Sequence, residues 1–300
     1  MKYTWENNKL TIETAGAYEG KTIEDFLNDY LQSKKNKYLL IQKKQILLND
    51  TAVKDIHEPI HQQNITLINE ESEIDWKMAN EPCEVVYEDA FVYIVHKKPG
   101  DIIHGDAEDT DCLNAQAARY QQIHGLHVPV RPIHRLDQDT TGLVLYSKLP
   151  FFQPWYDAQL TAKKIKRNYL AICIGKASIG QKFTCTQPLG RDRHVSNKYR
   201  ISPTGVSAVT HVECLDVKGS QCLMKCTLET GRTHQIRVHL SSRGYPIVND
   251  KLYGTPSQEY PSMCLWAYEI EIRNPITHKK HKIHDFPNSS FEQFDLHKKI

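Results

Sequence analysis

Apolar residues near the start of the chain recur at intervals of three and four. Between Ile23 and Leu31 they follow this spacing, which predicts an amphipathic helix with one apolar face. Thr22 stands directly before this run, and Asp25 stands three residues after Thr22, which is the pattern of a capping box. The helix is therefore predicted to begin after Thr22.

Three more short elements are predicted before residue 75. They are a second helix around 38–41 with lysines at both ends, a strand at 46–48 with its turn at Asn49-Asp50, and a closing strand at 65–68. Together these elements predict a small α/β module over residues 1–75. A polar, acidic stretch that ends at Pro82 follows, and we place a linker at 76–84.

Short apolar runs and alternating patterns dominate residues 85–300. The predicted helix is 111–124, and the predicted strands include 92–95, 143–146, 166–174, 221–228 and 234–240. On the last of these strands, Arg237 would point away from the apolar residues and into a cleft. The tail from His278 is interpreted as a solvated end, not a metal site. The pattern predicts an α+β fold, with flanking helices and a large mixed, mainly antiparallel sheet in residues 85–300.

Composition narrows the class of protein. The 300 residues can bury a substantial core. No apolar run approaches the roughly 18 residues of a membrane span, so we expect a cytoplasmic protein without a membrane. The eight cysteines are scattered and predict neither a disulfide framework nor a zinc site.

The net charge of +2 is too small to indicate a nucleic-acid binder, but local basic clusters are typical of one. The clusters are Lys34, Lys35, Lys37, Lys43 and Lys44; Lys163, Lys164, Lys166 and Arg167; and Arg191, Arg193, His194, Lys198 and Arg200.

One carboxylate stands out in the sequence His134-Arg135-Leu136-Asp137, which is followed by Thr140-Thr141-Gly142 and a buried apolar run. A carboxylate on a loop that enters the core must be paired, hydrogen-bonded or catalytic, because burying it alone is costly. From this stretch alone, a structural ion pair of Arg135 with Asp137 is the simpler interpretation.

The same stretch resembles the catalytic loop of the RluA family of pseudouridine synthases, which isomerise uridine in RNA. Further blocks follow in the family's order, at residues 85–104, 228–240, 244–250 and 252–254. The first 75 residues are similar to an RNA-binding module of the ribosomal-protein-S-four type. The alternative for them is a small domain used for packing or protein contact.

The resemblance implies a role for several residues. Asp137 is the catalytic acid, acting on the sugar or by proton abstraction that leads to a glycal; Arg237 pairs with it, and Tyr169 stacks on the target base. Arg135 fills the gap left by a flipped uridine. The expected RNA-binding residues are Arg135, His134, Thr140, Arg232, Lys34, Lys35, Lys37, Lys43 and Lys44.

The chain departs from the family pattern at two positions. Lys97-Lys98 stands where the family has Lys-Pro, so that turn is expected to be looser, and Trp266 stands where a histidine is usual. The resemblance implies a monomer without cofactor or metal. Its expected partner is ribosomal large-subunit RNA, with transfer RNA as the alternative.

Two other functions compete with this interpretation. The first is an RNA-binding protein of the same fold without turnover, and the presence of Asp137, Tyr169 and Arg237 together argues against it. The second is a metal-dependent hydrolase built on the histidines, which a metal analysis of the purified protein would identify.

Overall fold

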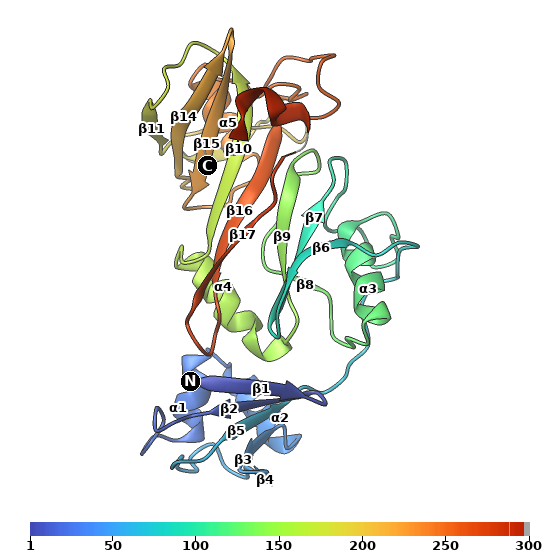
Figure 1. Ribbon diagram of the computed structural model, residues 1–300, viewed down its shortest axis with the longest axis vertical. Helices are drawn as coiled ribbons and strands as arrows, with labels where there is room; N and C mark the ends of the chain where they lie inside the picture. Colours follow the sequence, from blue (N-terminus) through green and yellow to red (C-terminus); the bar gives the residue numbers. More distant parts are fainter. Residues whose placement is uncertain (288, 297–300) are drawn as a thin grey trace.

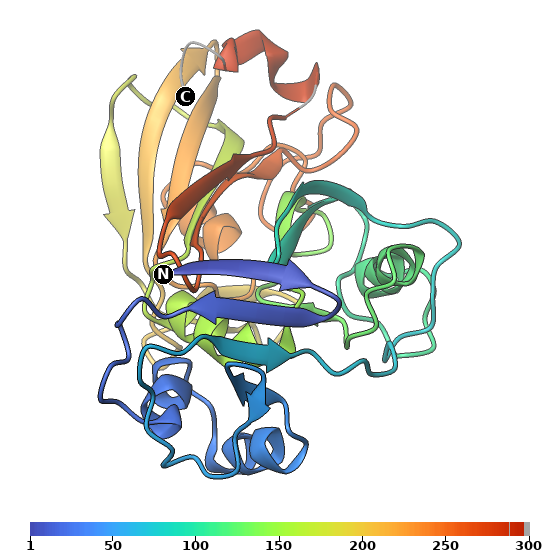
Figure 2. The same ribbon diagram turned by 60° about the horizontal axis from the view of Figure 1, so that its bottom comes forward.

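The protein is described by a computed structural model that covers residues 1–287 and 289–296. Its N-terminal part is a five-stranded sheet in the order β1-β2-β5-β3-β4, packed with two helices (Figures 1 and 2). The elements are β1 (Lys2–Glu6), β2 (Lys9–Glu13), α1 (Ile23–Asp29), α2 (Lys34–Gln42), β3 (Ile46–Leu48), β4 (Thr51–Ala52) and β5 (Ile65–Ile68).

Local signals in this part were correctly interpreted. The Thr22 hydroxyl accepts a hydrogen bond from the Asp25 amide, and the Asp25 carboxylate accepts one from the Thr22 amide at 2.8 Å, which completes the capping box. Asn49 and Asp50 both have positive φ and join β3 to β4 as a two-residue turn. Asparagine and aspartate tolerate this left-handed backbone, which is why they are common in tight hairpins.

The second part of the chain is built on a ten-stranded sheet. The strand order is β11-β14-β15-β10-β16-β9-β7-β6, with β17 paired to β16 and β8 paired to β9. The strands are β6 (Glu84–Glu88), β7 (Val92–Lys97), β8 (Arg131–Pro132), β9 (Thr141–Ser147), β10 (Lys166–Ile174), β11 (Lys182–Cys185), β14 (Thr210–Lys218), β15 (Gln221–Leu228), β16 (Leu265–Arg273) and β17 (Lys280–His284). A separate hairpin pairs β12 (Leu189–Arg191) with β13 (Tyr199–Ile201). The helices are α3 (Leu113–Ile123), α4 (Gln153–Thr161) and α5 (Gln235–Ser242), with 3-10 turns η1 (Pro150–Phe152) and η2 (Ser289–Phe294).

The predicted fold class is confirmed: the sheet is mixed and mainly antiparallel. β9 and β16 run parallel, whereas the other paired strands of this sheet run antiparallel. Gly142 makes the parallel contact possible, because a Cβ at this position would lie 2.3 Å from the carbonyl oxygen of Ala267. Its φ of +113° is also one that residues with side chains rarely adopt. The glycine of Thr140-Thr141-Gly142 is therefore required by packing.

Two sequence predictions were wrong. Residues 234–240 were expected to form a strand but belong mostly to helix α5, in which every residue from Gln235 to Leu240 is buried. Polar and apolar residues alternate over 235–240 as in a strand, because this helix buries its polar side chains as well as its apolar ones. The tail from His278 is not a solvated end either, since 280–284 form β17 and both Phe291 and Phe294 are buried.

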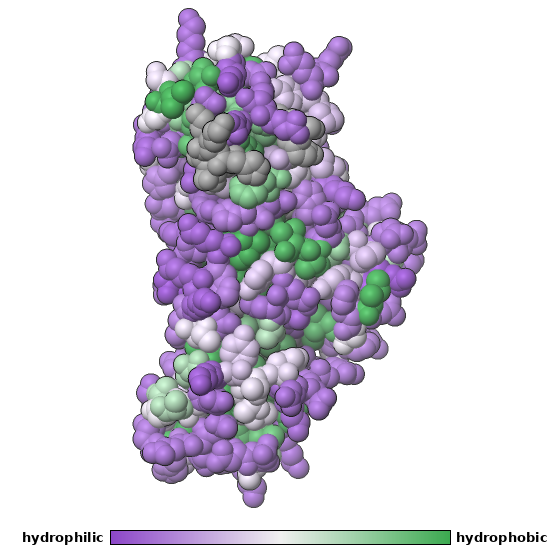
Figure 3. Space-filling view, viewed as in Figure 1, coloured by the Kyte–Doolittle hydropathy of each residue, from purple (hydrophilic) through white to green (hydrophobic). Residues whose placement is uncertain are grey.

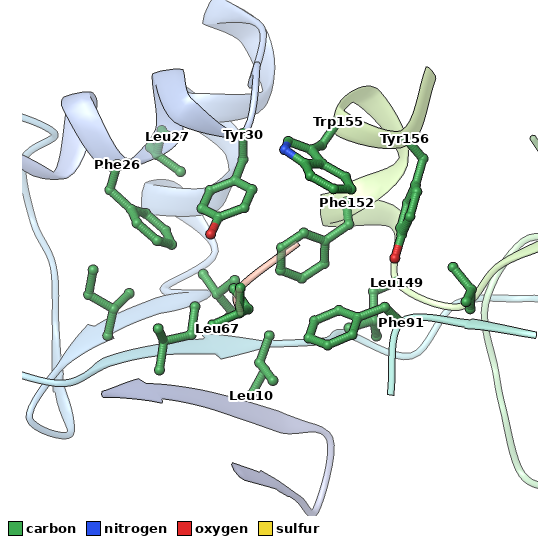
Figure 4. Close-up of a cluster of buried hydrophobic side chains, with 14 of the residues drawn as sticks. Leu10, Phe26, Leu27, Tyr30, Leu67, Phe91, Leu149, Phe152, Trp155 and Tyr156 are labelled. Carbon is green, nitrogen blue, oxygen red and sulfur yellow. The ribbon is translucent and has the colours of Figure 1, made fainter. Parts of the chain in front are cut away.

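The two sheets share an apolar core. Phe26 of α1 and Tyr30, which directly follows this helix, pack against Phe151 and Phe152, which immediately precede α4. Figure 4 shows Phe26, Tyr30 and Phe152 over the N-terminal sheet. Two hydrogen bonds cross the same contact: the Gln32 amide donates to the Phe151 carbonyl at 2.7 Å, and the Tyr30 hydroxyl donates to a carbonyl of the β16–β17 turn at 3.3 Å. The N-terminal part is therefore packed onto the larger sheet.

Residues 76–84, expected to be a linker, lie along α3. The amides of Ala79 and Cys83 donate to carbonyls of Ala115 and Gln116, at 3.1 and 3.2 Å. The division of the chain into domains at this segment stays a prediction.

All eight cysteines are buried and free. The face of the molecule in Figure 3 is mainly hydrophilic, with a hydrophobic patch at mid-height. In the part of the chain that the structure describes, no helix is long and apolar enough to cross a membrane.

Candidate active site

A cleft of about 530 Å³ opens beside the loop that carries Asp137. Its wall is formed by Leu265 of β16 together with four segments: 134–140, the end of α4 with the residues that follow, the start of β10, and 228–237. The resemblance had singled out the first and last of these segments, and the sheet order brings them together.

Asp137 and Arg237, which are 100 positions apart in the chain, meet in this cleft. Arg237 Nη1 lies 3.3 Å from Asp137 Oδ2. The Arg237 side chain is only 4% exposed, and that of Asp137 is 22% exposed. The carboxylate therefore has one oxygen near a fixed cation and remains accessible to a ligand. The predicted pairing of these residues is confirmed, although Arg237 reaches the cleft from a helix and not from a strand.

A second carboxylate, Asp250, holds Arg237 from behind. It accepts hydrogen bonds from Arg237 Nε at 2.7 Å and Nη2 at 2.8 Å, and it is 1% exposed. Burial opposes ionisation of Asp250, but Arg237 and the amides of Leu252 and Tyr253 outweigh it and hold its pKa below the usual value. Arg237 thus bridges two carboxylates in one buried chain of charges. Its own pKa is raised, because these carboxylates overcome the opposing effect of burial.

Sequence reasoning missed the role of Asp250, although the residue lies in a block that carries the resemblance. The available signal was its neighbourhood. Asp250 Oδ1 accepts hydrogen bonds from the amides of Leu252 and Tyr253, at 2.9 and 3.1 Å, in a tight turn that ends at Gly254. A Cβ at Gly254 would lie 2.0 Å from the carbonyl of Ile247, so only glycine fits there. The amides of this turn hold the Asp250 carboxylate in one orientation.

His234 begins the helix that carries Arg237, with a left-handed backbone at φ +56°. Its Nδ1 lies 2.9 Å from the hydroxyl of Tyr253, whose ring is 5.1 Å from the Arg237 guanidinium carbon. Burial lowers the pKa of His234. These contacts fix the orientation of the helix start.

Lys97 holds the loop of Asp137 from the other side. Its side chain is fully buried, and Nζ donates hydrogen bonds to the carbonyls of Lys98, Gln138 and Thr140, at 2.9, 2.7 and 2.9 Å. Burial lowers the pKa of Lys97 to about 8, although nearby aspartates favour the charged form. The turn at Lys97-Lys98, expected to be looser than in the family, is therefore tied directly to the Asp137 loop.

Three other expected site residues line the cleft and are buried: His134, Thr140 and Tyr169. His134 Nε2 accepts the Leu145 amide at 3.3 Å, and burial, assisted by Arg167, lowers its pKa to about 3. It is therefore neutral and orients the loop. The Thr140 amide donates to the Asp137 carbonyl at 3.1 Å. Burial raises the pKa of Tyr169, so its hydroxyl stays protonated.

The expected RNA contacts differ in accessibility. Arg135 and Arg232 are exposed at the cleft, and Arg232 Nε donates to the Ser207 carbonyl at 3.0 Å. Lys34, Lys35 and Lys44 are exposed on or after α2, and Lys43 is exposed but pairs with Glu70 at 2.6 Å.

Lys37 does not fit the expected role. It is buried, and its Nζ contacts Glu24 at 2.7 Å and Asn28 at 2.6 Å. Its charge therefore joins α2 to α1 and is not offered to a phosphate.

The sequence also contains His57-Glu58-Pro59-Ile60-His61, which has the H-E-x-x-H spacing of zinc proteases. That chemistry needs both histidines on one face of a helix, but this segment is not helical. His57 lies 3.7 Å from Glu24, and His61 lies 3.6 Å from Glu19. Among residues 1–287 and 289–296, no group of three or more His, Cys, Asp or Glu side chains could hold a metal ion.

Comparison with known proteins points to one family. The family model described as RNA pseudouridylate synthase matches residues 91–242. The chain is 32% identical to ribosomal large subunit pseudouridine synthase D of Vibrio parahaemolyticus over 92% of this chain and 89% of the relative. It is 39% identical to the uncharacterized RNA pseudouridine synthase YhcT of Bacillus subtilis, over 65% of each chain.

A solved structure shows the same fold. Human RNA pseudouridylate synthase domain containing 1 superposes with a TM-score of 0.58 at 23% identity, covering 72% of this chain and 87% of that one.

Proposed function

Because the chain belongs to the RNA pseudouridylate synthase family, we propose that it isomerises specific uridines to pseudouridine in structured RNA, with Asp137 as the catalytic acid. The observation that carries this proposal is the buried chain of charges from Asp250 through Arg237 to Asp137. It holds the partly exposed Asp137 carboxylate in place on the wall of a cleft large enough for a nucleotide.

The reaction breaks the bond between the sugar C1′ and uracil N1, turns the uracil, and joins C1′ to C5. The C5 proton is then removed and N1 gains a proton, so the product is an isomer of the substrate. Positive charge develops at C1′ as the base leaves, and a fixed carboxylate stabilises it. Asp137 serves this step by attack on the sugar or by proton abstraction that leads to a glycal. Arg237 orients the carboxylate for either route.

Tyr169 and Arg135 complete the proposed site. Tyr169 is buried at the cleft wall, where its ring would stack on the uracil and prevent the detached base from leaving. Arg135 is exposed at the mouth of the same cleft, where it would replace a uridine flipped out of its helix. Arg232 and the exposed lysines Lys34, Lys35 and Lys44 would contact phosphates.

We propose ribosomal large-subunit RNA as the substrate, supported by relatives in Vibrio and Pseudomonas that are named ribosomal large subunit pseudouridine synthase D. We also propose that residues 1–75 act as an RNA-binding module of the ribosomal-protein-S-four type. Their support is the two-helix and hairpin arrangement with exposed lysines at both ends of α2.

The test is to map pseudouridines in all RNA of cells with and without this gene, and then in cells that carry Asp137→Asn. Loss of a site in large-subunit RNA that the parent gene restores and the variant does not would support the proposal. Loss of a site in transfer RNA would identify transfer RNA as the substrate in place of large-subunit RNA. An unchanged map would favour the alternative of an RNA-binding protein without turnover.

A further inference from the structure

Arg167 is a buried cation in the wall of the cleft, and the described part of the chain supplies no partner for it. It lies on β10, its residue is 7% exposed, and it lines the cleft. Within residues 1–287 and 289–296, its guanidinium has no hydrogen-bond or ion-pair partner, and its Nε is buried without an acceptor. The other buried cations differ: Arg237 has two carboxylates, Lys97 has three carbonyls, and Lys37 has Glu24.

The carboxylates that line the cleft are already engaged. Asp137 faces Arg237, and Glu229 contacts Lys163 and His211 at the rim. A guanidinium that is buried without a counter-charge is unfavourable, so a protein that keeps one is expected to use it for a ligand. The ligand should carry negatively charged oxygens.

A glycine makes room for this guanidinium. A Cβ added to Gly231 would lie 2.8 Å from Arg167 Nη1 and 3.4 Å from Nη2, so a side chain at this position of the loop 230–232 would displace the end of the arginine. The backbone of Gly231 does not have positive φ. Glycine at this position of the Thr230-Gly231-Arg232 sequence therefore leaves space for Arg167.

A second donor lies in the same wall. His134 Nε2 accepts the Leu145 amide, which places the ring hydrogen of the neutral imidazole on Nδ1. This Nδ1 is buried and, among the described residues, makes no hydrogen bond of good geometry, although a backbone contact with Arg135 favours the protonated ring. His134 also lines the cleft, close enough to Arg167 for the guanidinium to disfavour its protonation.

The position of Arg167 relative to Tyr169 indicates which group of a bound nucleotide supplies the charged oxygens. The two residues are two apart on one strand and both line the cleft, which separates their backbones by about 7 Å. If the uracil stacks on Tyr169, the guanidinium lies at the separation of a base from the phosphate of its own nucleotide. A planar guanidinium with two parallel N–H groups also matches a phosphate.

We propose that Arg167 binds a phosphate flanking the flipped uridine, with His134 Nδ1 as a further donor and Gly231 as the residue that makes room. This inference rests on the proposed function, because it assumes a uridine in the cleft. It assigns to Arg167 the positioning of the target nucleotide, whereas the chemistry belongs to Asp137.

The experiment is a double-mutant cycle in which one change is made in the protein and the other in the RNA. The probe is a stem-loop that contains the mapped uridine, with a neutral methylphosphonate in place of either flanking phosphate. Affinity is measured by fluorescence anisotropy for the parent and for Arg167→Gln. We expect Arg167→Gln to weaken binding about tenfold to a hundredfold. One methylphosphonate should weaken the parent similarly and have little further effect on Arg167→Gln.

Matched variants show that the effect belongs to this site. Lys166→Gln removes an exposed charge from the adjacent position of β10, so its effect should add to that of either methylphosphonate. Arg167→Lys should keep part of the affinity. Gly231→Ala should displace the guanidinium and reproduce the coupling of Arg167→Gln, which covers the case in which Arg167→Gln unfolds. Thermal unfolding of each variant is recorded alongside.

Two results would overturn the inference. One is an Arg167→Gln effect that simply adds to both methylphosphonates. The other is coupling to 2-thiouridine or 4-thiouridine at the target, which would make a uracil oxygen the ligand. The binding cycle needs no turnover, so failure of the proposed function is seen separately, as absent conversion by a parent protein that still binds.

If no target is mapped, uridine 5′- and 3′-monophosphates compared with uridine serve as probes. The parent should bind one monophosphate more tightly than uridine, and Arg167→Gln should lose that difference. An equal difference in both proteins would contradict the inference.

Discussion

Asp250 holds Arg237 by two contacts, of 2.7 and 2.8 Å, both shorter than the 3.3 Å contact of Arg237 with Asp137. The buried pair fixes the plane of the guanidinium and leaves Nη1 free to face the cleft. The orientation of the proposed catalytic acid therefore depends on a residue that does not itself line the cleft.

Replacing Asp250 by alanine should strongly destabilise the protein. The change leaves a buried guanidinium with one partner in place of two, and breaking a buried ion pair costs about 3–5 kcal/mol. Urea unfolding of the variant should show this loss in the free energy of unfolding. Asp111→Ala, at an exposed position, is the control and should change stability by less than about 0.5 kcal/mol. A loss below about 1 kcal/mol for Asp250→Ala would mean that Asp137 alone holds the arginine.

Asp137→Asn should abolish the formation of pseudouridine while the protein stays folded and binds RNA. The amide keeps the size of the side chain but lacks the charge that the developing cation needs. Conversion of a saturating stem-loop, followed together with its dissociation constant, measures both effects. Turnover within about tenfold of the parent would exclude Asp137 as the principal catalyst, because that corresponds to only about 1.4 kcal/mol of barrier.

The buried His134 should make stability fall in mild acid. Burial, with Arg167 nearby, holds its pKa at about 3 in the folded protein, against an ordinary value of 6.5. Between these values the unfolded chain binds a proton that the folded protein does not, so stability decreases as the pH falls through 6.5. From about pH 7 to about pH 5, this residue should account for about 2 kcal/mol.

Urea unfolding of His134→Gln at both pH values measures this contribution. The variant should lose less stability on acidification than the parent does, by about the same amount. His127→Gln, at an exposed position, should lose as much as the parent. Equal losses in all three proteins would contradict the neutral, buried state of His134.

The exposed lysines beside α2 should affect the salt dependence of RNA binding. Replacing Lys34, Lys35 and Lys44 by glutamine removes up to three phosphate contacts, each worth about 0.7–0.9 in the slope of log K against log salt. Lys37→Gln offers a matched control, because its ammonium is buried on Glu24 and Asn28. It should lower stability and leave the slope unchanged.

An unchanged slope in the triple variant would mean that this module does not contact RNA. A slope altered by Lys37→Gln alone would mean that the lysine leaves its buried partners when RNA binds.

Short-range patterns predicted much of the fold. Strands β10 and β15 were predicted with the bounds that the structure has, and α1 begins at its predicted cap. The hairpin of β1 and β2 was missed, because its few apolar residues alternate with polar ones over only five positions. Its turn, Asn7-Asn8, has positive φ at both residues and was the signal available.

The candidate site was predictable only in part, since its contacts are tertiary. The meeting of Asp137 with Arg237 followed from the resemblance, because no local rule relates residues so far apart. Asp250 and Arg167 were not assigned roles. The role of Asp250 depends on its bidentate contact with Arg237, and that of Arg167 depends on a buried Nε that has no acceptor among the described residues. Lys37 was misjudged because a sequence shows the number of charges but not their partners.

The apolar core shared by the two sheets determines how the protein unfolds. Phe26 and Tyr30 of the first part fill space beside Phe151 and Phe152 of the second, so separating the parts would expose these rings to water. Neither part can then lose its structure without removing apolar support from the other, which is the condition for cooperative unfolding. Despite its two sheets, the chain should melt in one transition, and damage at the N-terminal helices should lower the thermal stability of the catalytic loop.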